Sequence, residues 1–482
     1  MKWISLGFAM LAAMPVTAQQ NPLKNAGKYG NTITAADLKK HLYIIASPEM
    51  EGRETATEGE RKAAAYIENH FRSLGLLPGN NGSYRQYFNV YRDVPGNSEL
   101  VVNGKAAVSG KDFVVTQGYS STLYFSEVLY MKELADTAKF DVAGKAVLVS
   151  MVPQQGKSSP AGFQLIRYAA RKGAAATFVA TGSKLTVPRG GGLSVELYRK
   201  TMAPNNVYIN VDLATAIVGS GFASGALQSG PVSVELKLKV DKQVEVLQSS
   251  NVLGVVEGSD KKDEYVFITA HYDHEGLKNG VLYPGADDDG SGTVAILEMA
   301  EAFAKAKADG KGPRRSVVFM TVSGEEKGLW GSAYYAAHPV FPLENTVVNL
   351  NIDMIGRVGV DYQKEPKDSG NYIYVIGDDK LSSDLRPISE AANKMYTKLK
   401  LDYKYNGDDP NRFYYRSDHF NFAKNGVPAI FYFNGVHEDY HKPTDTPDKI
   451  NYQLAEKRTR LVFFTAWEMA NRDQKVVRDR PL

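Results

Sequence analysis

Apolar residues in the second half of the chain fall into short runs that alternate with helical patterns. Five runs are almost wholly apolar, β-branched or aromatic: 265–269, 317–322, 347–352, 372–376 and 427–433. Apolar residues recur at helical spacing between them, over 293–307, 381–399 and 454–470. Strands that are apolar on both faces belong to a sheet covered on both sides, and alternation with helices favours parallel pairing. The pattern predicts an α/β fold, a three-layer sandwich around a mainly parallel mixed sheet.

The first half of the chain has a different texture. Helical patterns cover 35–46 and 55–74, and 84–91 is an aromatic-rich predicted strand. From about residue 103 to residue 242 the predicted strands are short and separated by Gly and Ser. We interpret 103–242 as a small β-rich domain inserted into a larger one. The larger domain would comprise 19–102 and 243–482.

The first eighteen residues have the layout of a secretory signal peptide. Lys2 is followed by an apolar run from Trp3 to Met14, and Val16-Thr17-Ala18 has the small-x-small form of a cleavage site. The run is too short for a transmembrane helix. We therefore expect an exported protein, periplasmic or extracellular, with no membrane span in the mature chain.

Composition excludes several classes of chemistry. The 482 residues carry 57 Lys and Arg against 54 Asp and Glu, a net charge of +3, which offers no electrostatic reason to expect nucleic-acid binding. Cysteine is absent, so a thiol nucleophile, a disulfide framework and a thiolate metal site are all excluded. Any metal must be held by His, Asp and Glu, and the chain has eight His.

Acidic and imidazole side chains follow the ends of several predicted strands. Five segments carry them: His271–His274, Gly285–Gly292, Ser323–Glu326, Asp353 and Tyr440–His441. In open α/β sheets, ligands bind outside the carboxyl ends of the strands. We therefore expect these segments to meet at one edge of the sheet.

Imidazole and carboxylate without thiolate suit a pair of divalent metal ions such as zinc. Two such ions lie about 3.5–4 Å apart and share a bridging carboxylate. Asp287 is the expected bridge, because its run of adjacent acids would repel itself without cations. One imidazole and one carboxylate would complete each site, and four residues supply that number: His271, His441, Glu326 and Asp353.

Neighbouring side chains on an extended chain point in opposite directions, so Glu325 and Glu326 should have different roles. One can ligate a metal, and the other can act as the general base of a hydrolysis. Asp273, two residues beyond His271, can accept the second imidazole N–H and fix the tautomer. Two further histidines of these motifs exceed the ligand count and are expected around the site: His274 and His419.

Taken in order, the motifs resemble those of the co-catalytic zinc metallopeptidases, which include secreted bacterial aminopeptidases and glutamate carboxypeptidases. The residues that carry the resemblance are His271-Tyr272-Asp273-His274, Gly285-Ala286-Asp287-Asp288, Ser323-Gly324-Glu325-Glu326, Asn351-Ile352-Asp353-Met354 and Tyr440-His441. It covers about residues 34–95 and 250–470 and includes Glu51-Gly52-Arg53. The inserted segment is similar to a protease-associated domain at 144–149 and 173–175.

The resemblance implies two zinc ions held by five residues: His271, Asp287 as the bridge, Glu326, Asp353 and His441. It implies Glu325 as general base and Asp273 as the partner of His271. It also implies a cis peptide between Asp287 and Asp288.

Two residues beside the implied ligands need separate comment. Tyr440 is either a hydrogen-bond donor to the tetrahedral oxyanion or a packing residue. Glu275 stands where members usually carry an apolar residue, and we expect it at the pocket rim without contact to a ligand.

The resulting functional prediction is a two-zinc exopeptidase acting on peptides, with an aminopeptidase as the first choice. A carboxypeptidase or dipeptidase on the same scaffold would need a cationic pocket for the substrate carboxylate, for which Arg412 and Arg416 are candidates. Glutaminyl cyclases share the fold, but a resemblance to them would imply a site with a single zinc ion. A non-catalytic binding module would have lost ligands, and none is lost here. The preferred side chain and the oligomeric state are not specified by the sequence.

Overall fold

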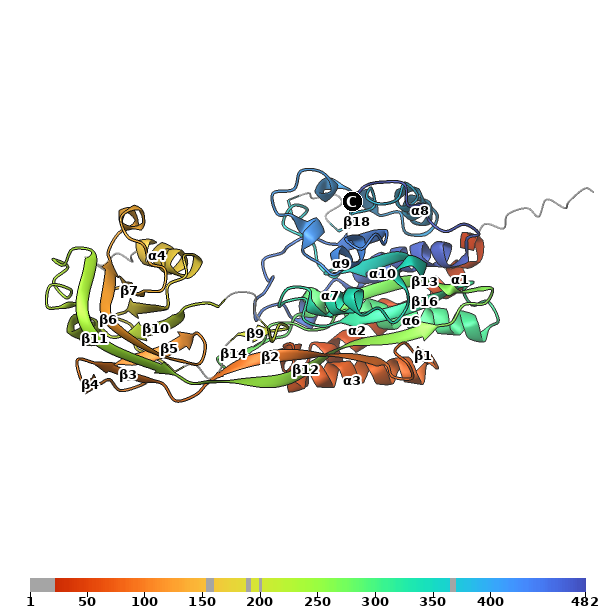
Figure 1. Cartoon of the computed structure of the whole chain (residues 1–482). Helices are drawn as coiled ribbons and strands as arrows, with labels where there is room; N and C mark the ends of the chain where they lie inside the picture. The colour runs from red at the N-terminus through yellow and green to blue at the C-terminus, as the bar shows by residue number, and fades with distance from the viewer. Residues whose placement is uncertain (1–21, 153–159, 188–191, 199–201, 365–369) are drawn as a thin grey trace, which may run out of the picture. The chain divides into compact units, whose positions relative to one another are not determined.

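The computed structural model describes residues 22–482 except 153–159, 188–191, 199–201 and 365–369 (Figure 1). The predicted signal peptide lies outside the described residues. Two compact units are present: one joins the described residues up to Phe88 with Ser249–Leu482, and the other is Asn89–Gln248. The boundaries predicted at 103 and 242 both lie inside the second unit. The reason is that β2 (Arg85–Pro95) and β12 (Lys242–Val256) each cross the boundary as one continuous strand.

The first unit contains a mixed sheet with a parallel centre. Besides β2 and β12 its strands are β1 (Leu77–Pro78), β13 (Lys261–His271), β16 (Arg315–Val322), β17 (Thr346–Ile352), β18 (Tyr372–Ile376), β19 (Lys400–Asp402) and β20 (Ala429–Phe433). A short strand of the second unit, β9 (Leu193–Ser194), pairs with the end of β2 that lies in that unit. The strand order is β19-β18-β20-β17-β13-β16-β12-β2-β9, with β1 on β12. The pairs β16–β13, β13–β17 and β17–β20 are parallel, and β12 and β18 are antiparallel to their neighbours β16 and β20. The predicted mixed sheet is confirmed, with parallel pairing at its centre and antiparallel pairing on both sides of it.

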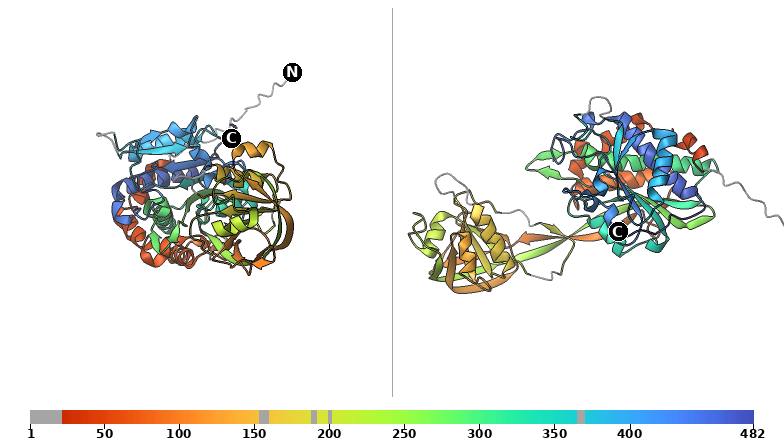
Figure 2. Two further views of the ribbon diagram at one scale, coloured as in Figure 1. Left: turned by 90° about the vertical axis from the view of Figure 1, so that its left-hand side faces the viewer. Right: turned by 90° about the horizontal axis from the view of Figure 1, so that it is seen from above.

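Helices cover both faces of this sheet (Figures 1 and 2). One face carries α2 (Ala35–Ile45), α3 (Glu58–Ser73), α6 (Gly292–Ala308), α8 (Leu385–Ala392) and α10 (Tyr452–Asn471), and the other carries α7 (Trp330–Ala337) and α9 (His419–Ala423). Alternate residues of each strand supply the two cores, as the pleat requires. In β13, Val266 and Ile268 pack with the first group of helices, and Phe267 packs with the second. The predicted three-layer sandwich is therefore confirmed.

One predicted helix is shorter than its pattern. The apolar spacing predicts a helix from residue 381, but α8 begins at Leu385. Leu381 adopts a left-handed backbone conformation, with φ of 62°, which a right-handed helix cannot include.

The second unit is a small β-rich body with its own core. Its strands are β3 (Glu99–Val102), β4 (Lys105–Ala106), β5 (Phe113–Gln117), β6 (Ser121–Met131), β7 (Ala146–Ser150), β8 (Ala176–Ala180), β10 (Asn205–Ile209) and β11 (Gly230–Val240). They form an eight-stranded sheet in the order β4-β3-β11-β6-β7-β8-β10-β5, packed with α4 (Pro160–Arg171) and α5 (Val211–Val218). In the part of the chain that the structure covers, no helix is both long and apolar enough to traverse a bilayer.

Candidate active site

Three neighbouring parallel strands of the first unit end at the same level. His271 at the end of β13 pairs with Val322 at the end of β16, and Asn351 near the end of β17 pairs with Thr269. The acidic segments that follow β16 and β17 therefore emerge at the same edge, on either side of His271. The turn 286–291 and the segment around His441 bring further carboxylate and imidazole groups to this edge. The five segments expected at one edge of the sheet do lie together.

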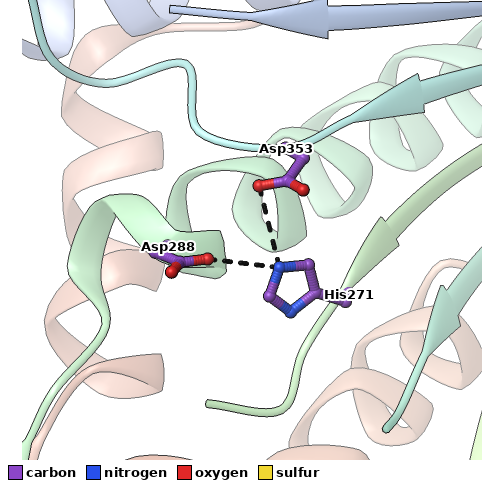
Figure 3. A group of neighbouring side chains, drawn as sticks. All are labelled: His271, Asp288 and Asp353. Carbon is purple, nitrogen blue, oxygen red and sulfur yellow. Dashed lines mark ion pairs between the residues drawn. The ribbon is translucent and has the colours of Figure 1, made fainter. Parts of the chain in front are cut away.

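A first group of potential ligands surrounds the imidazole of His271. Its Nε2 is 3.3 Å from Asp288 Oδ1 and 3.7 Å from Asp353 Oδ1, and all three residues are buried. Figure 3 shows the two carboxylates pointing at the same ring nitrogen from the turn before α6 and from the end of β17. One imidazole and two carboxylates at this spacing could hold a metal ion.

A second group lies on the other side of the Asp288 carboxylate. His441 Nε2 is 3.1 Å from Asp288 Oδ2 and 3.0 Å from Glu326 Oε2. His274 adds an imidazole, with Nδ1 2.8 Å from Glu326 Oε1. Asp288 thus faces both groups, one oxygen toward each, which is the arrangement of a bridging carboxylate.

The position of Asp288 corrects the sequence prediction, which chose Asp287 as the bridge. Asp287 points away from both groups: Oδ1 accepts the Gly356 N–H at 2.6 Å, and Oδ2 is 3.1 Å from His437 Nε2. The turn is held in this orientation by Asp445, whose Oδ2 accepts the main-chain N–H groups of both Asp287 and Asp288. Because the three adjacent residues are all aspartate, their order in the sequence could not distinguish them.

The third aspartate of the run has a structural role. Asp289 Oδ1 accepts the N–H of Gly292 at the start of α6 and the N–H of Met354 beyond β17, both at 2.9 Å. The non-proline cis peptide lies between Asp288 and Asp289. The sequence prediction placed it one residue earlier, between Asp287 and Asp288, which is the same one-residue error as the choice of bridge.

Glu275 lies beside the second group. Its carboxylate lies close enough to Glu326 and His441 for the three to hold one metal ion, so it does approach the predicted ligands. Lys278 forms an ion pair with Glu275. The second group is therefore flanked by one further carboxylate.

The charge balance of the site calls for cations. Among the described residues, His271 Nε2, Asp288 Oδ2 and Glu326 Oε1 are buried and, although charged groups lie close, none of them makes a well-aligned hydrogen bond. Burial lowers the pKa of His441, but Asp288 and Glu326 outweigh this effect and raise the pKa to about 10. Burial, together with the charges of Asp353 and Glu326, raises the pKa of Glu325 well above its usual value. Divalent ions would offset this surplus of negative charge, so the residues present fit a metal pair.

Glu325 lies beside the first group without belonging to it. Its Oε2 is 3.9 Å from His271 Nε2, and its main-chain N–H donates to Asp273 Oδ1 at 3.2 Å. Asp273 also accepts the hydroxyl of Thr55 at 2.8 Å. The His271 Nδ1 is 3.0 Å from the main-chain carbonyl of Asp273 and 3.7 Å from its carboxylate. The main-chain carbonyl of Asp273 can accept the Nδ1–H and leave Nε2 free to bind a metal, with the Asp273 carboxylate nearby but beyond hydrogen-bond distance.

A buried hydrogen-bond chain orients Asp353. Ser417 Oγ donates to Asp353 Oδ2 at 2.8 Å and accepts from Asn351 Nδ2 at 2.8 Å. Asn351 in turn accepts from Thr269 Oγ1 at 2.6 Å. This series of hydrogen bonds connects β13, β17 and the segment before α9. Neither the apolar pattern nor the motif spacing revealed it, since Ser417 carries no signal of its own in the sequence.

Tyr440 lies at the mouth of a small pocket beside Glu325. Its ring stacks on His441 with centroids 3.8 Å apart, and its hydroxyl accepts from Arg416 Nη2 at 3.2 Å. The pocket is lined by Asp288, Glu325, Asp353, Met354, Phe413, Arg416, Phe431, Phe433, Val436 and Tyr440. Arg412 is not among the residues lining it, so only one of the two candidate arginines reaches the site. His419 is buried against Phe431 behind this wall.

Part of the chain is similar in sequence to known proteins. Residues 251–466 match the family model of peptidase family M28. Aminopeptidase YwaD of Bacillus subtilis is 28% identical over 235 residues, which cover 47% of this chain and 46% of the relative. Aminopeptidase Y of Saccharomyces cerevisiae is 26% identical over 230 residues, covering 48% and 38%. The chain thus spans half or less of the length of these curated relatives.

Solved structures resemble the whole chain. The aminopeptidase from Aneurinibacillus sp. strain AM-1 superposes with a TM-score of 0.55 at 22% identity, over 95% of this chain and 99% of that one. The zinc aminopeptidase BSAP from Bacillus subtilis gives 0.54 at 20% identity, over 92% and 98%. At these identities the likeness establishes the fold.

Proposed function

We propose that this chain, whose residues 251–466 match the model of peptidase family M28, is a zinc-dependent exopeptidase, an aminopeptidase that releases N-terminal residues from peptides. The observation that carries the proposal is the carboxylate of Asp288. It stands between a group of His271 and Asp353 and a group of His441 and Glu326, within 3.3 Å of an imidazole on each side.

The proposed ligands follow from these distances. His271 and Asp353 would hold one zinc ion, His441 and Glu326 the other, and Asp288 both. Zinc held there would polarise the scissile carbonyl and acidify the attacking water. Asp273 would hold the His271 ring in one tautomer, and Ser417 would hold Asp353 in one orientation.

Glu325 is the proposed general base. Its carboxylate would take a proton from the attacking water and pass it to the leaving amine. Asp273 supports this role by fixing the main chain at Glu325. Tyr440 is a proposed donor to the oxyanion, because Arg416 occupies a lone pair of the hydroxyl and leaves its O–H free to donate. Burial raises the pKa of Tyr440, so the hydroxyl keeps its proton.

The pocket beside Glu325 is the proposed site for the substrate side chain next to the scissile bond. Phe413, Phe431 and Phe433 line it together with Arg416, and its volume of about 30 Å³ favours a small side chain there. A peptide panel that varies this side chain would test the preference.

One observation favours a second candidate, a dipeptidase or carboxypeptidase. Arg416 lines the same pocket and could pair with a substrate carboxylate. Parallel assays on free-amine and N-acetylated peptides, with and without a C-terminal amide, separate the two functions. An aminopeptidase loses activity when the amine is blocked, and a carboxypeptidase loses it when the carboxylate is amidated.

The decisive experiment for the main proposal is Glu325→Gln. Zinc content should stay at two ions per chain, and turnover of a free-amine peptide should fall by roughly 10²–10⁴-fold, the usual contribution of a general base. Glu344→Gln is the matched control, because Glu344 is exposed and precedes the opposite end of β17. Full activity of Glu325→Gln, or wild-type protein that binds no zinc, would contradict the proposal.

Two wider features complete the proposal. We propose that residues 1–18 are removed on export and that the protein acts in the periplasm or outside the cell. The unit Asn89–Gln248 is proposed to be a protease-associated domain, supported by its small β-rich fold.

A further inference from the structure

Arg53 is a fully buried cation close to the candidate metal site. It ends the turn Pro48–Arg53, in which Glu51, Gly52 and Arg53 all have left-handed backbone conformations. A Cβ on Gly52 would lie 2.6 Å from the carbonyl oxygens of Gly276 and Tyr283, so the turn is pressed against the segments that flank the site. The guanidinium is thereby placed between separate parts of the chain.

The hydrogen bonds of Arg53 go to main-chain carbonyls. Nε donates to Tyr272 O at 2.7 Å, and Nη1 donates to Pro284 O at 2.6 Å and to Ile45 O at 2.9 Å. Nη2 donates to Gly285 O at 2.9 Å. The main chain of Arg53 adds one more contact, because its carbonyl accepts the N–H of His274 at 3.1 Å.

Three of these four carbonyls belong to the segments beside two proposed ligands, His271 and the bridging Asp288. Tyr272 lies between His271 and Asp273, and Gly285 precedes Asp288 by three residues. Arg53 therefore ties the segment of one proposed ligand to the segment of the bridge. Ile45 is the last residue of α2, which anchors both loops to a helix.

The stability of the fold is by itself a weak explanation for a buried arginine. A buried cation loses its hydration, and an apolar side chain of similar volume often serves the fold as well. Burial lowers the pKa of Arg53 to about 10, so it stays charged at neutral pH. The nearby carboxylates that favour this charge are Asp273, Asp288, Asp445 and Asp289, all beside the site.

We propose that Arg53 is a positioning residue for the metal pair, holding the His271 loop and the Asp288 loop at the spacing that both ions require. This inference rests on the proposed function, since it assumes that His271 and Asp288 bind zinc. A guanidinium suits the role because its five N–H groups form a rigid fork that reaches carbonyls in different directions. A lysine has one nitrogen and cannot span the same four acceptors.

The test is Arg53→Lys, with zinc affinity measured by competition against a chelator. Losing an outer partner of metal ligands typically weakens binding about 10–100-fold, and we expect that range here. Arg315→Lys is the matched control: Arg315 is equally buried and donates to the carbonyls of Met469 and Arg472. Arg315 is the first residue of β16, and the last residue of that strand lies at the site. At about 3.3 Å per residue, Arg315 is about 23 Å from that end. The control should lower the thermal midpoint of zinc-free protein but leave zinc affinity unchanged.

Each outcome decides the question. Wild-type zinc affinity in Arg53→Lys, or an equal loss in Arg315→Lys, would overturn the inference while leaving the proposed function intact. Arg53→Met, which keeps the apolar stem without any donor, is made in parallel. If neither Arg53 variant folds while Arg315→Lys does, Arg53 serves the fold itself and the positioning role is wrong. If the wild-type protein binds no zinc, the proposed function fails first.

Discussion

The choice of bridging carboxylate can be tested by exchanging one oxygen at each of two adjacent residues. Asp287→Asn and Asp288→Asn are nearly isosteric and have the same effect on net charge. Asp288 presents Oδ1 to His271 at 3.3 Å and Oδ2 to His441 at 3.1 Å, whereas Asp287 faces His437 and the Gly356 N–H. The two variants should therefore fail in different ways.

Asp288→Asn removes charge from both ligand groups at once. Losing a residue that hydrogen-bonds a metal ligand lowers metal affinity by up to about 100-fold. Losing a ligand shared by both ions should lower it by at least that factor, which corresponds to roughly 2.8 kcal/mol. We expect zinc content well below two ions per chain and little peptide hydrolysis. The fold should persist, because the neighbouring Asp289 still bonds Gly292 and Met354.

Asp287→Asn should instead lower stability and keep the metal pair. The asparagine can still accept from Gly356, but the buried contact with His437 loses its charge. Disrupting a buried polar pair of this kind costs roughly 1–3 kcal/mol of unfolding free energy. Zinc content is read by atomic emission after dialysis, and stability by thermal unfolding of zinc-free protein. Loss of zinc from Asp287→Asn, with two ions retained in Asp288→Asn, would refute the assignment of the bridge.

Two further predictions concern groups around the site. Ser417→Ala removes the donor to Asp353 and should weaken zinc binding by about 10–100-fold in a chelator competition; unchanged affinity would show that the hydrogen-bond chain does not orient this ligand. The second concerns Glu298, whose pKa burial raises to about 8, and its neighbour His41, whose pKa burial lowers to about 4. In the folded pair Glu298 keeps its proton up to about pH 8, while in the unfolded chain the histidine loses its own around 6.5 and the glutamate is already ionised, so stability should fall by roughly 1 kcal/mol as pH rises from 6.5 to 8. Glu298→Gln should flatten that slope in urea unfolding at pH 6.5 and pH 8; a slope equal to wild type would contradict the assignment.

The sequence alone determined the architecture and the chemistry of the edge. Continuous apolar runs such as Val317–Val322 and Val347–Ile352 require a sheet covered on both sides, and the structure has that sheet. Parallel strands bring their carboxyl ends to one level, so His271, Glu326 and Asp353 were expected together although they are far apart in sequence. This reasoning works because periodicity and strand direction are local properties that do not depend on side-chain orientation.

Only the tertiary structure decided which member of each local set faces the site. Asp287, Asp288 and Asp289 are chemically identical, and their directions depend on Asp445, which is 157 residues beyond Asp288. The same holds for Arg53, whose acceptors come from three separate segments. Hydrogen bonds between distant segments set the direction of each side chain, and neither residue type nor spacing records them. The sequence therefore determined that carboxylates and imidazoles meet at this edge, and the folded chain determined which oxygen faces which nitrogen.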